Sequence, residues 1–395
     1  MPNESDTRLI RHLQPRNFLS FGPEFPGLDL RSLNVLIGAN GSGKSNLIEV
    51  INLLRASPKD WREVTRKGGG VSEWIWKGER NGTAALEAIV SSRKGRDSLR
   101  HAMAFNVVSQ SFALDEERIE NEEPYPGQTQ THCYYRYQFG IPVLNTLSQG
   151  MKRLDRDSIE PDRSILAQRR DPDAYPEVAR LASSYESVRI YREWAFGRNT
   201  IFREPQQADM RRDVLEEDFS NLGLFLNRLK TEFPAAKRAI LKALQDLYEG
   251  ISDFEVNTSG GTVQVFLHEG DFAIPATRLS DGTLRYLCLL AILCDPEPPP
   301  LICIEEPELG LHPDILPTLA DLLTSASERT QLIVTTHSDI LVDAMTDTPE
   351  CVVICEKHEG KTEMNRLATG DLSEWLVKYR LGQLWIDGQL GGKRW

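Results

Sequence analysis

The chain has 395 residues, of which 40% are hydrophobic and 26% are charged, and this composition excludes wholesale disorder and a collagen-like fibre. At about 150 residues per domain, the length predicts two or three folding units, or one large domain with a lobe. The net charge is 46 minus 58, or −12, which disfavours a basic protein that coats nucleic acid but is compatible with a local basic groove.

The sequence predicts a cytoplasmic protein without a membrane segment. Residues 1–7 lack an apolar signal core, and the longest apolar run, 287–294, is far shorter than the roughly 20 residues that cross a bilayer. Six cysteines in a chain of this length do not make a disulfide framework. A metal site at Cys351, Cys355 and His358 would lack a fourth ligand. We therefore expect buried thiols at the cysteines in apolar runs, which are Cys288, Cys294, Cys303, Cys351 and Cys355.

Residues 8–140 are predicted to form a strand-rich first part with one well-marked helix. A short apolar strand over 33–37 leads into a glycine-rich segment, 38–45. A helix follows, because Leu47, Val50, Ile51 and Leu54 recur at helical spacing. We also expect a flexible turn around 68–70 and a solvated acidic loop over 115–123.

The remaining chain is predicted to be helical and polar from about 150 to 250, and then to alternate strands with helices. Amphipathic helices follow Ser220, as N-cap, and precede Gly250, and a hairpin turns at 259–261. A helix over 284–292, strands at 301–304, 332–334 and 351–355, and a helix over 315–323 come next. The predicted fold class is α/β, with a largely parallel central sheet, an antiparallel β part and a helical lobe. The predicted domains are 1–145, 146–278 and 279–395.

The segment from Gly38 to Ser45 fits the pattern G-x-x-x-x-G-K-[ST], with a strand before it and a helix after it. Glycines let successive backbone N–H groups point at a β-phosphate, beside the positive end of the helix. We expect Lys44 to bridge the β- and γ-phosphates and the Ser45 hydroxyl to bind Mg²⁺. A loop that only turns the chain would explain Gly41 and Gly43, but it gives no reason for Lys44 and Ser45.

Two carboxylates end the apolar strand at 301–304. Glu305 is predicted to approach Mg²⁺, directly or through water, although most P-loop proteins place Asp there. Glu306 is predicted to orient or deprotonate the hydrolytic water. A plain acidic loop at a sheet edge is the alternative, and the phosphate loop in the same chain makes that alternative weaker.

Two further segments carry weaker signals. Ser280 and Gly282 offer a hydroxyl and an open backbone at a helix start, where a γ-phosphate can bind. His337 follows the 332–334 strand and can donate to a γ-phosphate. Taken alone, the first segment is an ordinary N-cap, and the second is a capped helix start at Ser338.

Together these segments resemble the ATP-binding-cassette-like ATPases of the structural-maintenance-of-chromosomes, RecF and overcoming-lysogenization-defect group, and the P-loop fold of their head domains. The matching segments are GANGSGKSNL at 38–47, LSDGT at 279–283, IEEPELGLHP at 304–313 and THS at 336–338. Across nearly its whole length the chain looks like a group of bacterial predicted ATPases of this kind.

The resemblance implies a homodimer with two ATP molecules sandwiched between the subunits. The cofactor-binding residues of one subunit would be Gly38, Ala39, Asn40, Gly41, Ser42, Gly43, Lys44, Ser45 and Asn46, and they would face Ser280, Asp281 and Gly282 of the other. Lys44, Glu306 and His337 would be catalytic, with His337 as the γ-phosphate switch, and Ser45 and Glu305 would hold Mg²⁺. The segment 308–312 would occupy the D-loop position. Gln110, Gln138 and Gln168 all remain candidates for the family's glutamine loop.

Two absences narrow the function. The stretch between Lys44 and Ser280 holds no long heptad arms, which excludes a chromosome-spanning coiled coil. Only 395 − 337 = 58 residues follow His337, too few for a nuclease domain, so any nuclease should belong to another polypeptide. The DxD patterns at 155–157 and 171–173 follow no apolar strand, and we interpret both as surface turns.

We expect an ATP-hydrolysing dimer that acts on DNA in repair or in defence against phage. Its basic surface would come from Lys152, Arg153, Arg156, Arg163, Arg169, Arg170, Arg211 and Arg212, which nearby carboxylates dilute. The alternative is a slowly hydrolysing, ATP-gated scaffold that regulates a separate effector protein and binds little DNA, and the net charge favours it slightly. A transporter motor fits less well, because the helical lobe is longer than such motors need.

Overall fold

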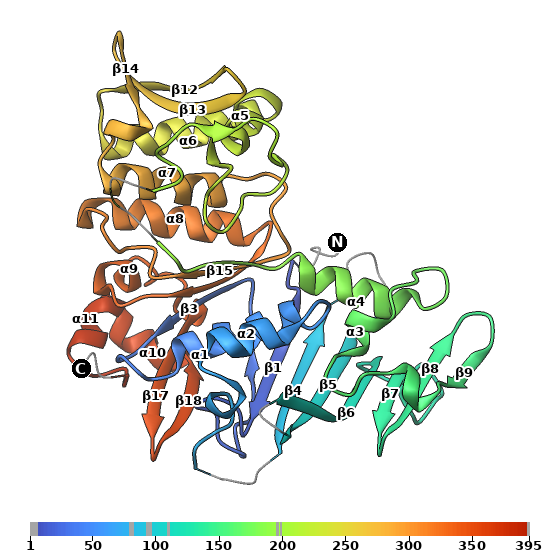
Figure 1. Cartoon of the computed structure of the whole chain (residues 1–395). Coiled ribbons are helices and arrows are strands. Elements are labelled where there is room, and N and C mark those ends of the chain that lie inside the picture. Colours follow the sequence, from blue (N-terminus) through green and yellow to red (C-terminus); the bar gives the residue numbers. More distant parts are fainter. Residues whose placement is uncertain are drawn as a thin grey trace. The chain divides into compact units, whose positions relative to one another are not determined.

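The computed structural model describes residues 7–78, 83–91, 97–108, 111–194, 197 and 200–392. The chain divides into two compact units. The first comprises Met1–Val188, Val353–Arg366 and Gly391–Trp395, and the second comprises Arg189–Val352 and Leu367–Leu390. Figure 1 labels most elements of both units.

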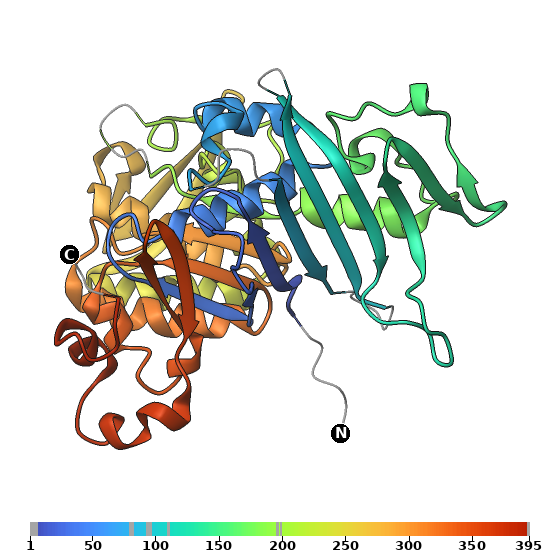
Figure 2. The same ribbon diagram turned by 90° about the horizontal axis from the view of Figure 1, so that it is seen from below.

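An eight-stranded sheet dominates the first unit, in the order β2-β1-β4-β5-β6-β7-β8-β9. Its strands are β1 (Ile10–Arg16), β2 (Leu28–Asp29), β4 (Ala84–Val90), β5 (Leu99–Val108), β6 (Ser111–Asn121), β7 (Cys133–Gln138), β8 (Ile141–Thr146) and β9 (Gly150–Arg153). Every neighbouring pair in this order is antiparallel. This larger sheet is therefore the antiparallel β part of the predicted fold, and it has eight strands. The prediction of a largely parallel sheet is wrong for it. Figure 2 shows its twist.

The acidic run at 115–123, predicted as a solvated loop, lies mostly in β6, so that prediction is wrong. The period-2 alternation of a strand explains why: Glu116 and Arg118 are exposed, while Glu117 and Ile119, which alternate with them, are fully buried. The buried Glu117 carboxylate accepts hydrogen bonds from the Ser164 hydroxyl and from the Ile165 N–H at 2.9 Å. Polar partners inside the unit make this buried carboxyl group tolerable, and composition alone could not reveal them.

Two more buried side chains complete this cluster. His101 Nε2 lies 3.3 Å from Glu117 Oε1, and His101 Nδ1 lies 3.1 Å from the Tyr185 hydroxyl. The cluster joins β5 and β6 to the short helix α3 (Ile165–Gln168) and to α4 (Pro176–Glu186). It therefore ties one face of the eight-stranded sheet to the helices that cover it.

The predicted strand and helix around the glycine-rich segment are confirmed. They are β3 (Leu33–Ile37) and α1 (Lys44–Ala56), and α1 buries Leu47, Val50, Ile51 and Leu54 as expected. In the first unit β3 neighbours β17 (Val352–His358), which forms an antiparallel hairpin with β18 (Lys361–Arg366). Helix α2 (Trp61–Lys67) follows α1 and precedes a turn at Gly68–Gly70.

Parallel pairing, as predicted, occurs in the second unit. Strand β15 (Leu301–Glu305) pairs in parallel with β10 (Arg189–Tyr191) and with β16 (Gln331–Thr335). The predicted helices appear as α7 (Asp281–Leu293) and α8 (Leu316–Ser327), and α8 follows a 3-10 turn at Pro313–Ile315. Shorter helices complete this part: α9 (Asp339–Asp343), α10 (Thr369–Leu376) and α11 (Leu381–Ile386).

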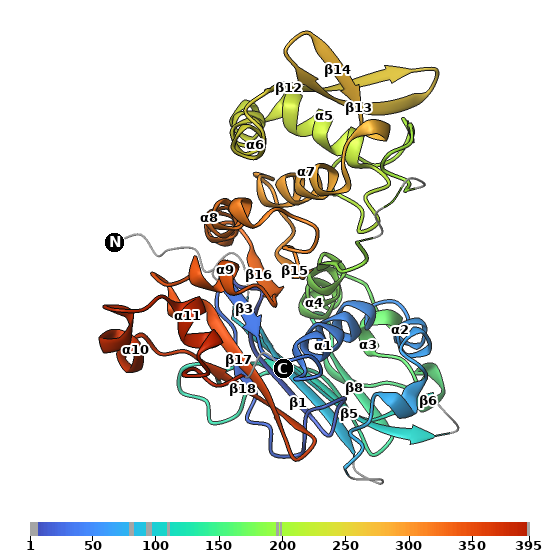
Figure 3. The same ribbon diagram turned by 90° about the vertical axis from the view of Figure 1, so that its left-hand side faces the viewer.

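The rest of the second unit is a helix pair beneath a small antiparallel sheet, visible in Figure 3. Helices α5 (Leu222–Glu232) and α6 (Pro234–Leu247) contact β12 (Ile251–Ser259), which forms the predicted hairpin with β13 (Thr262–Glu269). Strands β11 (Gln206–Gln207) and β14 (Phe272–Pro275) flank β13. The predicted N-cap and helix stop are off by one and two positions, because Asn221 is the N-cap of α5 and Tyr248 is the C-cap of α6.

The five cysteines predicted to be buried are buried, and burial raises the pKa of the Cys294 and Cys355 thiols to about 12. Within the described part of the chain, no cluster of three or more His, Cys, Asp or Glu side chains is arranged to hold a metal ion. No described helix has the length and apolar character to cross a membrane.

Candidate nucleotide-binding site

The glycine-rich loop curls around the end of the Lys44 side chain. Lys44 is buried, and its Nζ donates to the carbonyl oxygens of Gly38 and Ala39, both at 2.9 Å. A cation that bonds to main-chain oxygens at a helix N-terminus is poised to exchange them for phosphate oxygens, which bind it more strongly.

The loop glycines also make room for the β17–β18 hairpin of the first unit. Gly43 has φ +104°, and a Cβ there would collide with the Thr362 hydroxyl, which in turn donates to Ser42 O at 3.0 Å. The Thr362 hydroxyl also bonds the Ser20 hydroxyl at 2.6 Å, and Asn46 Nδ2 donates to the same Ser20 oxygen at 2.7 Å. Ser20 and Thr362 thus brace the loop from distant parts of the sequence, and no sequence pattern pointed to them.

The loop fits a bound triphosphate. The Ser42 hydroxyl is buried and has no hydrogen-bond partner among the residues that the structure describes. Such an orphaned hydroxyl is costly unless a ligand satisfies it. Ser45, exposed at the start of α1, offers the hydroxyl oxygen that Mg²⁺ prefers.

In the second unit, Ser280 is the N-cap of α7. Its Oγ accepts from Thr283 N at 3.0 Å, and the next residue, Asp281, forms an ion pair with Arg203. Arg203 also donates to Leu279 O at 2.7 Å, so it fixes the main chain just before the helix. A Cβ at Gly282 would lie 2.8 Å from Gly310 O. The two backbones approach so closely here that only glycine fits.

The carboxylates at the end of β15 have separate surroundings. Glu305 Oε1 lies 3.6 Å from Arg192 Nη2, and the Glu305 carbonyl accepts from Trp194 Nε1 at 2.7 Å. A carboxylate oxygen is a ligand that suits Mg²⁺, and Mg²⁺ commonly takes only one or two protein ligands beside phosphates and waters. Glu305 therefore offers an oxygen that fits this ion, with Arg192 as a competing charge beside it.

Glu306 and His337, both predicted as catalytic, lie together in the structure. His337 Nε2 is 3.7 Å from Glu306 Oε1. Glu308 holds the histidine segment in place, because its Oε1 accepts from Thr336 Oγ1 at 2.7 Å and from His337 N at 2.8 Å. Burial raises the pKa of the Glu308 carboxyl. Sequence reasoning placed Glu308 only in the D-loop position and missed this anchoring contact.

The three glutamine-loop candidates can be located in part. Gln110 lies outside the described residues. Gln138 Nε2 donates to Glu116 Oε1 at 2.7 Å, and Gln168 Nε2 donates to Arg163 O at 2.8 Å. Both side chains therefore take part in bonds within the first unit.

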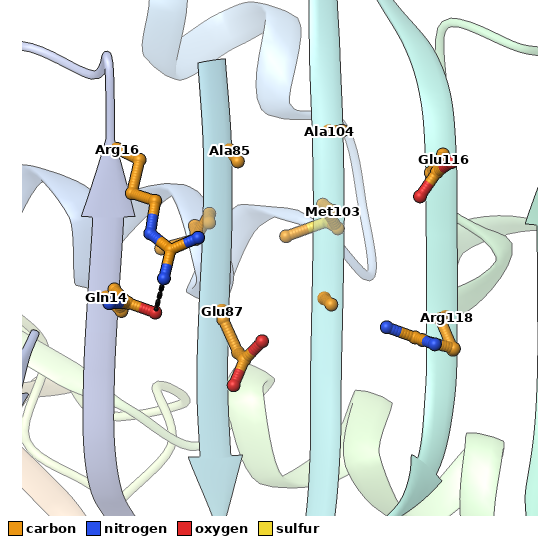
Figure 4. A pocket seen from close by; sticks show the side chains of 10 residues that line it. Gln14, Arg16, Ala85, Glu87, Met103, Ala104, Glu116 and Arg118 are labelled. Carbon is orange, nitrogen blue, oxygen red and sulfur yellow. Dashed lines mark hydrogen bonds between the residues drawn. The ribbon is translucent and has the colours of Figure 1, made fainter. Parts of the chain in front are cut away.

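A pocket on the eight-stranded sheet is made from other residues. It lies on the face turned away from α3 and α4 and has an alanine floor with charged side chains around it (Figure 4). Its lining residues are Gln14, Arg16, Ala85, Leu86, Glu87, Ala102, Met103, Ala104, Glu116 and Arg118. No predicted site residue lines this pocket.

Comparison with known proteins agrees with this architecture. Residues 33–343 match the family described as “AAA domain, putative AbiEii toxin, Type IV TA system”. An SMC head bound to the C-winged helix domain of ScpA has 16% identity and a TM-score of 0.55, over 93% of this chain and 99% of that one.

A second structure gives the same fold. It is the Smc head domain with an extended coiled coil bound to the C-terminal domain of ScpA, derived from Pyrococcus furiosus, with 14% identity, a TM-score of 0.55 and coverage of 94% and 99%. No curated protein matches the sequence. The predicted likeness to ABC- and SMC-type ATPases is confirmed, with an SMC-head-like α/β fold of several sheets. Because the match spans most of its length, the chain belongs to this family of AAA-domain proteins.

Proposed function

We propose that this protein is a Mg²⁺-dependent ATPase that works as a homodimer, with ATP bound between the two copies. The observation that carries the proposal is the buried Lys44 ammonium, held on two loop carbonyls at the start of α1 beside the unpartnered Ser42 hydroxyl of the described loop. Both groups can bind phosphate oxygens once these displace the carbonyls from Lys44, and family membership points to the same chemistry.

Each group in the two segments has its own task. ATP and Mg²⁺ supply the phosphoanhydride bond and the charge that offsets the phosphates. The loop N–H groups and Lys44 bind and orient the phosphates, and Ser45 and Glu305 offer oxygens to the ion. Glu306 orients a water and takes its proton at the carboxylate, and His337, 3.7 Å away, can share that proton or donate to a phosphate.

The homodimer is supported by the second unit. Ser280 is exposed at the start of α7, and the ion pair of Arg203 with Asp281 holds that helix start in a fixed shape. A rigid, exposed helix N-terminus with a hydroxyl suits an anion brought by a second copy. The proposal is that this end of one copy closes over the nucleotide held by the other.

The test is the Glu306→Gln variant. We expect it to bind ATP like the parent but to hydrolyse it at least about 100-fold more slowly, because the proton acceptor is gone. We also expect an ATP-dependent dimer in size-exclusion chromatography with light scattering. Glu328→Gln, a change at an exposed carboxylate, is the matched control. Parental hydrolysis by Glu306→Gln would contradict the role assigned to Glu306.

Regulation of a separate effector protein is favoured over tight DNA binding by one observation. Four arginines of the expected basic surface face carboxylates: Arg163 with Glu160 at 3.5 Å, Arg170 with Glu186 at 2.8 Å, Arg211 with Asp213 at 2.8 Å, and Arg212 with Glu232 at 3.6 Å. Such pairs leave less positive charge for phosphates, and both SMC heads compared above carry a bound protein domain. DNA affinity that falls steeply between about 50 and 200 mM salt would instead favour the role in DNA repair or phage defence.

A further inference from the structure

Arg285 is a buried cation in α7, five positions after Ser280. The residue is only 5% exposed, and its Nη2 donates to the carbonyl oxygen of Glu306 at 2.8 Å. Burial of a guanidinium is unfavourable, and it lowers the pKa of Arg285 to about 10. The molecule therefore places a costly charge on the backbone of the residue that is proposed to act on water.

Trp194 forms the seat of this arginine. The Arg285 guanidinium carbon lies 4.4 Å from the centre of the Trp194 ring, a cation–π distance, and the ring stacks on Phe219 at 5.4 Å. The same indole donates to the carbonyl of Glu305 at 2.7 Å. Two side chains in contact with each other thus hold two consecutive carbonyls at the end of β15.

The backbone that they hold is in an unusual conformation. Glu306 has φ +47°, in the left-handed region that residues other than glycine rarely adopt. Its N–H donates to Thr335 O at 3.0 Å, so both the N–H and the carbonyl of Glu306 are fixed. Such a conformation persists only where the surroundings enforce it, and it decides where the side chain points.

We propose that Arg285, seated on Trp194, is a positioning residue that fixes the left-handed backbone of Glu306 and thereby aims its carboxylate. Because Arg285 lies on the same helix as Ser280, it also links the start of α7 to that carboxylate. A second link runs through Gly282, because a Cβ at this glycine would lie 2.8 Å from the carbonyl oxygen of Gly310, in the segment after Glu306. The inference rests on the proposed ATPase function and adds to it a route from the helix that Ser280 caps to the catalytic glutamate.

The experiment measures ATP binding and turnover of the full chain separately. Arg285→Gln should lower kcat at least about tenfold and leave the Kd for ATP within about twofold, because the glycine loop is untouched. Arg285→Lys should have a kcat between those of the parent and of Arg285→Gln, since an ammonium can still reach a carbonyl. The matched control is Arg329→Gln. Arg329 also donates to backbone carbonyls, that of Leu293 at the far end of α7 at 2.8 Å and that of Ser325 in α8 at 3.0 Å. It should lose thermal stability and keep the parental kcat.

The outcomes separate the two proposals. If the parent hydrolyses ATP and the Lys44→Ala variant still hydrolyses it, the proposed ATPase function itself is contradicted. If the parent is active and Arg285→Gln keeps kcat within about twofold, or if Arg329→Gln loses kcat equally, the positioning role is overturned. Should Arg285→Gln not fold, Trp194→Phe retains an aromatic seat but removes the donor to Glu305. A fall in kcat of about threefold or more at constant Kd then supports the role, and unchanged kcat overturns it.

Discussion

In the glycine loop, the groups that would meet a phosphate belong to consecutive residues, 38–46, and most of them are main-chain atoms. At the end of β15, the backbone of Glu305 and Glu306 is held by side chains 111 and 21 positions away in the sequence, those of Trp194 and Arg285. The first arrangement is set mainly by local sequence and glycine conformations. The second depends on buried side chains from elsewhere, so the two should respond differently to substitution.

The largest expected effect is at the loop, where one side chain carries the charge. Lys44→Ala removes the ammonium that now bonds Gly38 O and Ala39 O. Charge-assisted hydrogen bonds contribute about 1.5–3 kcal/mol each, so ATP affinity should fall at least about 100-fold by calorimetry. The exposed Lys59 lies just beyond α1, and Lys59→Ala should leave the affinity unchanged. Equal losses in both variants would show that general charge, not the cradle, binds the nucleotide.

A pair of glycine variants tests how far the loop depends on the hairpin behind it. Gly43→Ala should destabilise the protein by about 2 kcal/mol or more, because φ +104° is unfavourable and the methyl group meets the Thr362 hydroxyl. Gly41 has φ +77°, and no described heavy atom lies within 4 Å of the place that a methyl group would take, so Gly41→Ala should cost about 1 kcal/mol. Urea denaturation measures both. Equal costs would mean that the hairpin exerts no constraint on the loop.

The smallest expected effect concerns the buried carboxylate beside His337. Burial raises the pKa of Glu308 in the folded state, so its favourable contribution is complete at pH values below about 4.5 and is lost as pH rises through the folded pKa. Glu308→Gln keeps an acceptor for Thr336 and His337 without the charge. At pH 7 the variant should be at least as stable as the parent, within about 1 kcal/mol, and this advantage should shrink toward pH 4.5. A parent that is more stable at pH 7 would point to an ionic role for Glu308 instead.

Sequence reasoning succeeded where the local spacing of residues decides the structure. The strand, loop and helix from Leu33 to Ala56 follow from apolar spacing and glycines, and β15 and β16 follow from short apolar runs. Glu306 and His337, predicted separately as catalytic, lie 3.7 Å apart, and their roles stay predictions.

The features that the sequence did not reveal have a common physical cause: polar groups are satisfied by partners that lie far away in the sequence. A glutamate in an acidic run looks solvated, yet Glu117 is buried because Ser164 and His101 meet it from distant positions. An arginine inside an apolar helix looks like an irregularity, yet Arg285 bonds a carbonyl 21 residues away. Ser20 and Thr362 support the loop across 342 positions. No local pattern encodes such partners, so neither β6 nor the setting of Glu306 could be derived from the sequence.

The strand β9 has a consequence for how copies of this protein meet. It ends the eight-stranded sheet, spans only Gly150–Arg153, and all four of its residues are exposed. Unpaired strand edges invite neighbouring chains to extend a sheet into fibres, whereas short edges that carry Lys and Arg resist this. Lys152 and Arg153 would repel the same strand of another copy. Crowded molecules should therefore stay apart at this border, leaving self-association to surfaces other than the sheet edge.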